Sequence, residues 1–484
     1  MTRTRGRRAC RPPGRAAAAV ACLVLGGAAL AACTAVPTTA PPTTPAPPAQ
    51  TLTASPLTAP PGARTPEPLD PDDWPTYHRD AARTGAGPAS PALGTTGELG
   101  SAWHTKLDGA VYGEPLVVHG LVVAATESNT IYALDAATGQ IAWQRSVGVP
   151  ARASALPCGN IDPLGITGTP VYDPATGLVF AVAELSDGSH VLVGVDAKDG
   201  SLAVRREVEP PRGSRIAYQQ RAALSLLGGR IYIAYGGLYG DCSDYTGTVL
   251  SVSTTGGGPV EDYVVPTSRE GGIWAPGGPA VDGARLLVGV GNGASTTDYD
   301  GSDSVIALDA SLRRTDFFAP STWARENAAD ADLGSMTPVR VGPYVFMDGK
   351  GGTAYVLDAG HLGGIGGALA QAAACRAYGA PSVTGMTVYV PCDGWLQEMT
   401  VTSPPGLRLG WRLPVRAAGS PVTGYGAVWV VDYETGDLYA LDPASGGIRR
   451  HAQLGPVPHF ASPTLSGGRA FVGTLDGVAA LSVG

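Results

Sequence analysis

The chain has 484 residues, of which 68 are glycine and 42 are proline, while only 15% are charged. An apolar fraction of 44% excludes a disordered chain, and so many turn formers exclude a helical bundle. The net charge of −8 argues against a basic, nucleic-acid-binding face, so we expect no nucleic-acid partner. This balance predicts an all-β protein built from many short strands and turns.

The first 32 residues have the layout of an export signal. Six arginines precede an apolar run over residues 16–30, which is too short to span a membrane. The run ends in Leu30-Ala31-Ala32-Cys33, which resembles the lipobox of bacterial lipoproteins. The resemblance implies cleavage before Cys33, a lipid on its sulfur and an extracytoplasmic protein anchored to the cell membrane. The alternative is an ordinary secretory signal with a chance cysteine.

A proline-rich segment follows the lipobox. Residues 34–69 hold eleven prolines, with threonine and alanine at most of the positions between them. No periodic apolar face exists in this segment, so it cannot pack into a core. We therefore expect a disordered linker over residues 33–70 and a single folded domain over residues 71–484.

Four cysteines lie in the expected folded domain, and four cysteines allow three pairings. Cys375 and Cys392 flank a segment that is typical of a hairpin with its turn near Thr384, so these two should face each other. This pairing leaves Cys158 and Cys242 as the second pair. Disulfides suit an exported protein, and unpaired buried thiols are the alternative.

A repeated pattern organises the chain from Trp103 onward. In its clearest copies a small or polar residue and a proline open an apolar strand, a glycine turn leads to a second strand, and a third strand ends in Leu-Asp. Copies open at positions 115, 170, 223, 279, 338, 381, 421 and 463, about 50 residues apart. Four short strands with their turns fill that length, so the pattern predicts an eight-bladed β-propeller of four-stranded antiparallel blades.

The eighth copy stops at Gly484, too early for an outer strand of its own. An unused strand over residues 100–107 mirrors residues 139–143, the predicted outer strand of the first blade. We expect the amino-terminal strand to complete the last blade, because a closed ring leaves no sheet edge exposed.

The first blade carries a specific motif. Residues 133–143, Ala-Leu-Asp-Ala-Ala-Thr-Gly-Gln-Ile-Ala-Trp, match the tryptophan-docking motif of pyrroloquinoline quinone (PQQ) propellers. In that motif the tryptophan packs between blades, the glycine makes the turn and the aspartate ties the corner. The chain from about Trp74 onward thus resembles the PQQ-type propeller superfamily. Its members include quinoprotein dehydrogenases and a non-enzymatic lipoprotein scaffold of outer-membrane assembly, so the fold leaves the function open.

The repeats are longer in the first half of the domain. The first four intervals average about 56 residues and the last three about 42. Extra residues in repeat proteins lie in loops, often on the binding face. We therefore expect the loops of blades 1 to 4 to build that face.

The resemblance implies cofactor-binding residues there. Trp274 stands where the dehydrogenases place the tryptophan beneath the quinone, and Lys350 where a cation holds the quinone oxygens. Asn292 and Asp241 stand where an amide and an acid bind calcium, although the family has the longer glutamate in place of Asp241. This interpretation implies PQQ and calcium as cofactors.

The family also implies a catalytic aspartate that acts as base toward the alcohol. Asp332 or Asp330 would fill this role, and we prefer Asp332. Arg221, Tyr218 and His459 precede inner strands and are candidates for ligand contacts in the central funnel. Each candidate also has a purely structural interpretation, such as a packing tryptophan, a turn asparagine, a loop-capping aspartate or a solvated lysine.

Three features depart from the dehydrogenase pattern. The chain has no adjacent Cys-Cys pair to cover a quinone, no Cys-x-x-Cys-His haem motif, and Tyr112 where the family has a glutamate. Two functions therefore remain. One is a PQQ- and calcium-dependent dehydrogenase for an alcohol or a sugar, and the other is a non-catalytic binding or scaffold propeller at the cell envelope. In both cases we expect a monomer with a small-molecule or protein ligand at the funnel.

Overall fold

A computed structural model describes residues 66–90, 92–94 and 97–483, which belong to the compact unit Pro56–Gly484. The expected signal peptide, the lipidated Cys33 and the linker up to residue 65 lie outside the described residues. Glu67 is already tied to the folded domain, since its backbone N–H donates a hydrogen bond to the carbonyl of Pro174. No helix within the described ranges is long and apolar enough to cross a membrane.

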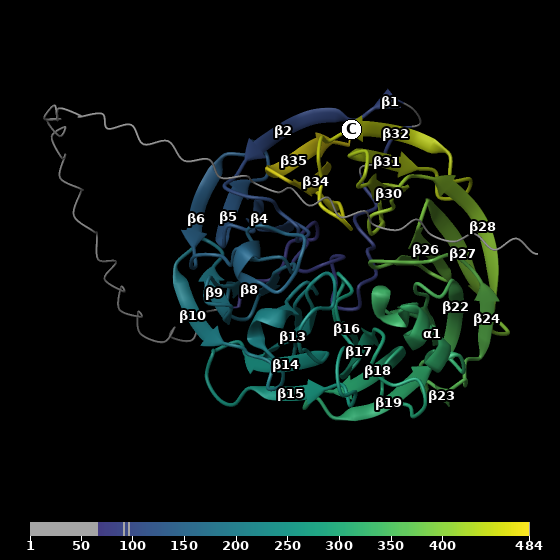
Figure 1. Ribbon diagram of the computed structural model, residues 1–484. Helices are drawn as coiled ribbons and strands as arrows, with labels where there is room; N and C mark the ends of the chain where they lie inside the picture. The colour runs from purple at the N-terminus through teal and green to yellow at the C-terminus, as the bar shows by residue number, and fades with distance from the viewer. Residues whose placement is uncertain (1–65, 91, 95–96, 484) are drawn as a thin grey trace, which may run out of the picture. The chain divides into compact units, whose positions relative to one another are not determined.

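Eight antiparallel sheets of four strands surround a common axis in the described part of the chain, as Figure 1 shows. Blade 1 contains β3 (Leu116–Val118), β4 (Leu121–Ala125), β5 (Thr130–Asp135) and β6 (Ile141–Ser146). Blade 2 contains β7 (Val171–Asp173), β8 (Leu178–Glu184), β9 (His190–Asp196) and β10 (Leu202–Glu207). Blade 3 contains β12 (Ser225–Leu227), β13 (Arg230–Gly237), β14 (Thr248–Ser253) and β15 (Glu261–Val264). Blade 4 contains β16 (Ala280–Asp282), β17 (Arg285–Val290), β18 (Ser304–Asp309) and β19 (Arg314–Ala319).

The second half of the ring repeats the arrangement. Blade 5 contains β20 (Val339–Val341), β21 (Tyr344–Met347), β22 (Thr353–Asp358) and β24 (Ala370–Ala373). Blade 6 contains β25 (Ser382–Thr384), β26 (Thr387–Cys392), β27 (Trp395–Thr402) and β28 (Gly406–Pro414). Blade 7 contains β29 (Val422–Gly424), β30 (Ala427–Asp432), β31 (Asp437–Leu441) and β32 (Ile448–Gln453). Blade 8 contains β33 (Thr464–Ser466), β34 (Arg469–Thr474), β35 (Gly477–Ser482) and β2 (Gly100–Lys106). Three two-residue strands extend these sheets: β1 (Gly97–Glu98), β11 (Tyr218–Gln219) and β23 (Gly364–Ile365).

The predicted propeller is confirmed, and every inner strand begins within two residues of its predicted opening. The middle strands are mostly apolar and buried, because both faces of a blade pack against neighbouring blades. Strand β8 is the clearest case, since all seven of its residues are buried. In outer strands such as β2, exposed side chains alternate with partly buried ones instead.

The amino-terminal strand closes the ring, as the repeat count predicts. β2 pairs antiparallel with β35, with Gly100 opposite Ser482 and Lys106 opposite Gly477. The last blade is therefore assembled from both ends of the described chain, and β2 covers the outer edge of β35.

Tryptophan docking joins consecutive blades. The indole N–H of Trp143 on β6 donates a 2.9 Å hydrogen bond to the carbonyl of Ala197 in blade 2, and its ring covers Gly200. Asp135 ties the corner as the motif predicts, because its Oδ1 accepts the backbone N–H groups of Ala137 and Thr138. The same contact recurs between blades 8 and 1 and between blades 6 and 7, through the pairs Trp103/Gly139 and Trp411/Gly446.

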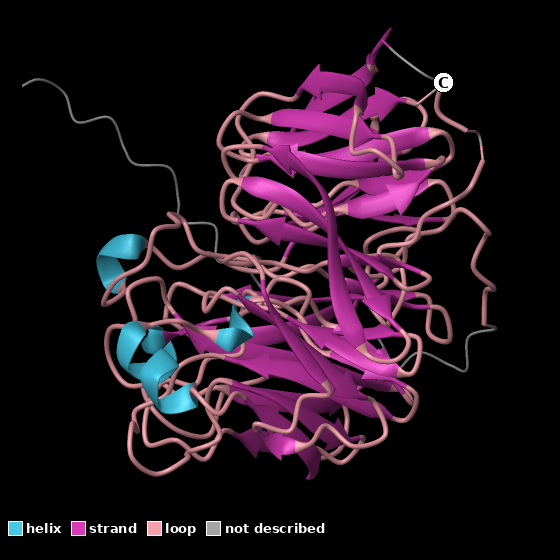
Figure 2. Cartoon of the chain, turned by 90° about the vertical axis from the view of Figure 1, so that its right-hand side faces the viewer, coloured by secondary structure: helices cyan, strands magenta, loops and turns pink. Residues whose placement is uncertain are grey.

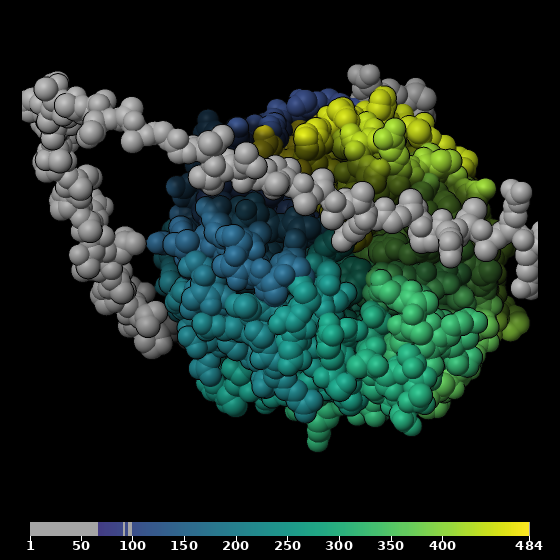
Figure 3. All heavy atoms as spheres, viewed as in Figure 1, coloured from purple at the N-terminus to yellow at the C-terminus, as the bar shows by residue number. Residues whose placement is uncertain are grey.

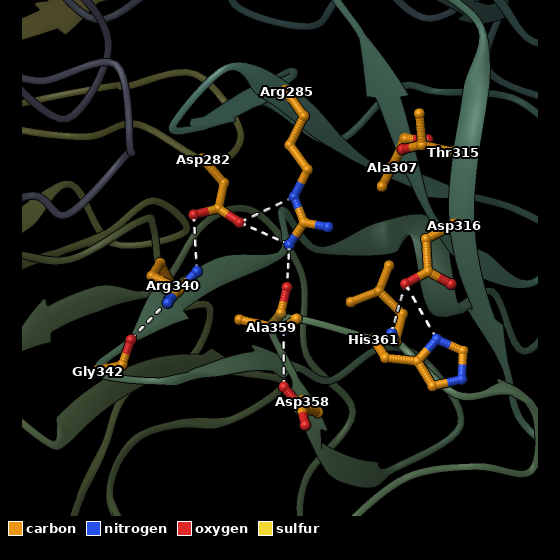
Figure 4. A network of polar contacts seen from close by, with 12 residues as sticks. Asp282, Arg285, Ala307, Thr315, Asp316, Arg340, Gly342, Asp358, Ala359 and His361 are labelled. Carbon is orange, nitrogen blue, oxygen red and sulfur yellow. Dashed lines mark hydrogen bonds and ion pairs between the residues drawn. The ribbon is translucent and has the colours of Figure 1, made fainter.

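An ionic network joins blades 4 and 5 (Figure 4). Asp282, at the end of β16, accepts hydrogen bonds from Arg285 at 2.7 Å and from Arg340 of β20 at 2.9 Å. Arg285 also donates to the backbone carbonyl of Ala359. Because Asp282 receives arginines from both blades, it fixes their relative position.

Residues 74–88 fill the centre of the ring, which the sequence did not predict (purple in Figure 1). Their backbone hydrogen-bonds to inner strands of several blades, because the inner edge of each blade has unpaired groups. The partners include Val117, Tyr172, Val281, Val383 and Thr423. We call residues 74–88 the axial segment.

Short helices gather at one face of the ring (Figure 2). They are η1 (Ala153–Ala155), η2 (Arg215–Ala217), α1 (Trp323–Ala329) and η3 (Leu333–Ser335). All four lie in connections between blades 1 and 5, which agrees with the longer repeats of the first half. Both predicted disulfides form, Cys158–Cys242 and Cys375–Cys392.

The docking contact predicts a graded response to alanine substitution. Gly200 (φ +70°) and Gly229 (φ +73°) share a left-handed backbone, but a Cβ at Gly200 would lie 2.5 Å from the Trp143 ring and one at Gly229 would meet no atom within 4 Å. We expect Gly229→Ala to cost about 1 kcal/mol through its φ alone. Gly200→Ala should cost a further 1–3 kcal/mol or so, because the ring must move. Equal losses in urea unfolding of the two variants would contradict this role of Trp143.

Candidate functional site

A cavity of about 520 Å³ lies near the axis on the helix-bearing face. Figure 3 shows that face hollowed near its centre. Eight of the nine candidates named from the sequence line this cavity: Arg221, Asp241, Trp274, Asn292, Asp330, Asp332, Lys350 and His459. The structure thus brings together residues that are spread over 239 positions of the sequence.

The lining residues occupy equivalent places in different blades. One group lies four to seven residues before an inner strand, where the chain crosses the top of the ring toward the axis. This group comprises Tyr112, Arg221, Trp274, Asp332, Tyr378 and His459. A second group follows the second strand of a blade and comprises Leu238, Asn292 and Lys350.

An ion pair lies at the centre of the site. The ammonium of Lys350 is 2.6 Å from Oδ2 of Asp332 and 3.0 Å from Oδ1 of Asp330. Oδ1 of Asp332 accepts the backbone N–H of Asn292 at 2.7 Å. The Asp332 side chain is only 3% exposed, whereas that of Asp330 is 70% exposed. Asp332 is therefore the buried ion-pair partner of Lys350, and Asp330 is a second partner at the surface.

Burial and charge act together on this pair. Burial raises the pKa of Asp332, although Lys350 and the N–H of Asn292 stabilise its charged form. Burial would lower the pKa of Lys350, but Asp332 and Asp330 outweigh it, so the pKa of this lysine is raised. Lys350 is therefore a stable cation at neutral pH, beside a carboxylate more basic than usual.

The indole of Trp274 provides a flat wall. Its Cβ rests against Gly236, where an added Cβ would approach to 2.9 Å, so a side chain at that position would displace the ring. The Lys350 nitrogen lies 5.7 Å from the indole centroid. The centroid of the Phe460 ring lies 6.3 Å from the centroid of the indole.

Arg221 is a buried cation at the edge of the cavity. Its guanidinium donates to the carbonyl of His459 at 3.1 Å and lies 5.9 Å and 5.8 Å from the ring centroids of Tyr112 and Phe460. Burial, together with Arg221, lowers the pKa of His459, so this imidazole is neutral at physiological pH. Tyr218, predicted to face the funnel, does not line the cavity. It is fully buried, and its hydroxyl is bonded to Arg212 and Thr246.

The expected calcium ligands are only partly arranged for a metal. Asn292 is next to Asp332, but Oδ1 of Asp241 accepts the hydroxyl of Tyr245 at 2.5 Å, and both oxygens of Asp332 are engaged. Within the described ranges, no set of three carboxylate, imidazole or thiol ligands comes together in this cavity. A cation here would need oxygen ligands beyond these side chains.

The sequence interpretation missed several lining residues, including Arg376 and Tyr378. Tyr378 lies four residues before β25, so the spacing rule of the first group would have found it. Arg376 follows Cys375, and Asp241 precedes Cys242. Each disulfide therefore anchors a segment of the cavity wall.

Three comparisons with known proteins bear on this fold and site. A family model described as outer membrane protein assembly factor BamB matches residues 92–278. A polyvinylalcohol dehydrogenase of Sphingopyxis sp. (strain 113P3) is 24% identical over 78% of this chain and 65% of its own length. The dehydrogenase subunit of a quinone alcohol dehydrogenase of Komagataeibacter europaeus is 30% identical over 34% of this chain and 22% of its own. Among solved structures, the quinohemoprotein alcohol dehydrogenase of Comamonas testosteroni superposes with a TM-score of 0.67 at 16% identity, covering 85% of this chain and 81% of that one.

The chain is a PQQ-type eight-bladed β-propeller. This propeller spans about two thirds of the length of the first curated relative and about a fifth of the second. The solved structure shares the fold at an identity too low to carry an activity with it.

The Lys350–Asp332 ion pair predicts that substitutions of its two residues have non-additive effects on the free energy of unfolding. Lys350→Met leaves the Asp332 carboxylate buried without a counter-ion, which should cost about 3–5 kcal/mol of unfolding free energy. Adding Asp332→Asn should recover most of that loss, because asparagine still accepts the N–H of Asn292 without a charge. Arg313→Met, in an ion pair whose arginine is 80% exposed, serves as the control and should cost less than about 1 kcal/mol. Additive losses in urea unfolding would contradict the coupling.

Proposed function

We propose that the protein is an extracytoplasmic dehydrogenase that uses PQQ to oxidise an alcohol or a sugar in the axial cavity. The observation that carries this proposal is the convergence of Trp274, Lys350 and Asp332 around one open space. The two curated relatives described above, both named as alcohol-oxidising dehydrogenases, support it.

The cavity suits a planar anionic quinone. Its volume of about 520 Å³ falls within the range of small-molecule sites. The indole of Trp274 would stack on the quinone plane, and Lys350 and Arg221 would hold its oxygens and carboxylates. When bound, PQQ would supply the two-electron acceptor that the protein's own side chains lack.

Asp332 is the group best placed to take the hydroxyl proton of the substrate. Its raised pKa makes it a stronger base than an ordinary carboxylate, and Lys350 keeps it ionised. Its low exposure excludes bulk water, so the proton passes to a carboxylate oxygen rather than to solvent. Asp330, which is exposed, would assist by holding Lys350.

Calcium fits this site less completely than the quinone does. Asn292 and Asp241 offer two side chains, whereas Ca²⁺ takes six to eight oxygens. We therefore propose that calcium binds only with the quinone, with the remaining ligands coming from that molecule or from water.

A non-catalytic binding or scaffold propeller is the competing proposal. It is favoured by the match to the BamB family model and by the Lys350–Asp332 pair, which already satisfies both charges without a ligand. In that case the cavity and its aromatic wall would receive a protein or small-molecule ligand without chemistry.

We further propose that Cys33 carries a lipid that anchors the protein outside the cytoplasm. The two disulfides of the described chain support an oxidising compartment. Cys33→Ser should abolish labelling by a radioactive fatty acid and release the protein from membranes, whereas Cys22→Ser should change neither. Continued labelling of the Cys33→Ser protein would overturn the anchor.

Quinone binding is tested by titrating PQQ with Ca²⁺ into the full chain and recording heat and tryptophan fluorescence. We expect saturation in the micromolar range, and Trp274→Ala should weaken binding about tenfold or more because the stacking surface is lost. Trp395→Ala serves as the control, since Trp395 packs under Arg412 outside the cavity.

The same preparations test catalysis through reduction of a dye with a panel of alcohols and sugars. Asp332→Asn should bind PQQ but lose turnover. Absence of saturable PQQ binding would reject the dehydrogenase and favour the binding propeller. Binding that Trp274→Ala leaves unchanged would reject this cavity as the site.

A further inference from the structure

A second group of candidate ligands lies outside the axial cavity, where the linker joins the ring. Asp70, Asp73 and His119 bring one ligand atom each to within 4.8 Å of one another. His119 occupies the β3–β4 turn, and the two aspartates directly precede the axial segment. Within the described ranges this is the single group of three such residues.

The spacing of these atoms suits a shared cation better than hydrogen bonds. Nδ1 of His119 lies 3.6 Å from Oδ2 of Asp70 and 3.7 Å from Oδ2 of Asp73. Both distances are too long for a hydrogen bond. Ligands at about 2.0–2.1 Å from a tetrahedral zinc ion lie roughly 3.3–3.4 Å apart, so a contraction of a few tenths of an ångström would complete the site.

The surrounding hydrogen bonds orient the ligands. Nε2 of His119 lies 3.3 Å from the hydroxyl of Tyr172, so a proton on Nε2 leaves the Nδ1 lone pair facing the carboxylates. Asp73 is 3% exposed at its side chain and accepts the backbone N–H groups of His119 and Asp70, each at 2.9 Å. Such partners hold a carboxylate in place without neutralising it.

The charge and the donor atoms of the three residues suit a bound divalent cation. Two carboxylates and a neutral imidazole leave two negative charges, which one divalent cation would balance. A cavity of about 340 Å³ borders His119 and Tyr172 but not the two aspartates, and the 67% exposure of the Asp70 side chain lets water reach that side of the cluster. The nitrogen ligand favours zinc-like ions over calcium.

We propose that Asp70, Asp73 and His119 form a binding site for Zn²⁺ or a similar transition-metal ion. The ion clamps the start of the folded domain to the first blade, and Tyr172 extends the clamp to the second. The site is independent of the axial cavity and of its proposed chemistry. Its role is to hold the entry to the axial segment, so metal binding stabilises the fold.

The test uses the full chain, stripped with a chelator and titrated with Zn²⁺ by calorimetry. We expect one equivalent to bind at micromolar concentration, a rise of several degrees in the unfolding temperature, and visible absorption bands when Co²⁺ replaces Zn²⁺. Asp70→Asn should weaken Zn²⁺ binding about tenfold or more, and the variant should fold normally because the Asp70 side chain is 67% exposed. Tyr172→Phe keeps the ring and should weaken binding by about 10- to 100-fold.

Two histidine variants separate a metal site from an ordinary ion pair. His119→Asn should abolish binding, and asparagine tolerates the left-handed φ of 50° at this position. His104→Asn is the matched control, because His104 pairs with Asp476 at 3.2 Å on the outer strand and should not affect Zn²⁺. Absence of saturable Zn²⁺ binding, or binding that His119→Asn and Asp70→Asn leave unchanged, would overturn the proposal and leave a simple ion pair.

Discussion

The pairing of β2 with β35 is the constraint on which the rest of the structure depends. A propeller blade is held by its two neighbours, so an open ring would leave two blades with one neighbour each and two unprotected faces. Joining the two ends of the described chain within blade 8 removes that weakness. Because the ring is closed, loops from blades as far apart in sequence as blade 1 and blade 8 converge on one axis. Tyr112 and His459 thereby line the same cavity.

The two ends of the ring's central axis differ in what occupies them. The inner edge of each blade leaves backbone groups without a sheet partner, and the axial segment satisfies many of them. Several of its polar side chains, including His78 and Arg83, are deeply buried, and burial raises the pKa of the neighbouring Glu114 to about 8. At the helix-bearing end the axis stays open, and charged and aromatic side chains surround the space. The channel is therefore filled at one end and available to a ligand at the other.

The two sites differ in the chemistry they offer. In the axial cavity a lysine already neutralises the buried carboxylate, and aromatic rings such as those of Trp274 and Phe460 line the wall, which suits a planar organic anion. At the linker junction two carboxylates face an imidazole nitrogen, which suits a metal.

Much of this molecule could be predicted from its sequence, because strand periodicity, Gly turns and the Leu-Asp endings are local signals. These signals predicted the eight blades, the closing strand and the disulfide between hairpin neighbours. The resemblance to PQQ-type propellers implied the docking of Trp143 and six residues that line the cavity, and a position before an inner strand added Arg221 and His459. The sequence could not reveal the axial segment, because its hydrogen bonds join residues hundreds of positions apart. The pairing of Lys350 with Asp332 within blade 5 and the meeting of Asp70 with His119 likewise depend on how the loops fold over the blades. Tertiary structure alone decided these contacts, since distance and burial in the folded chain set them rather than any local pattern.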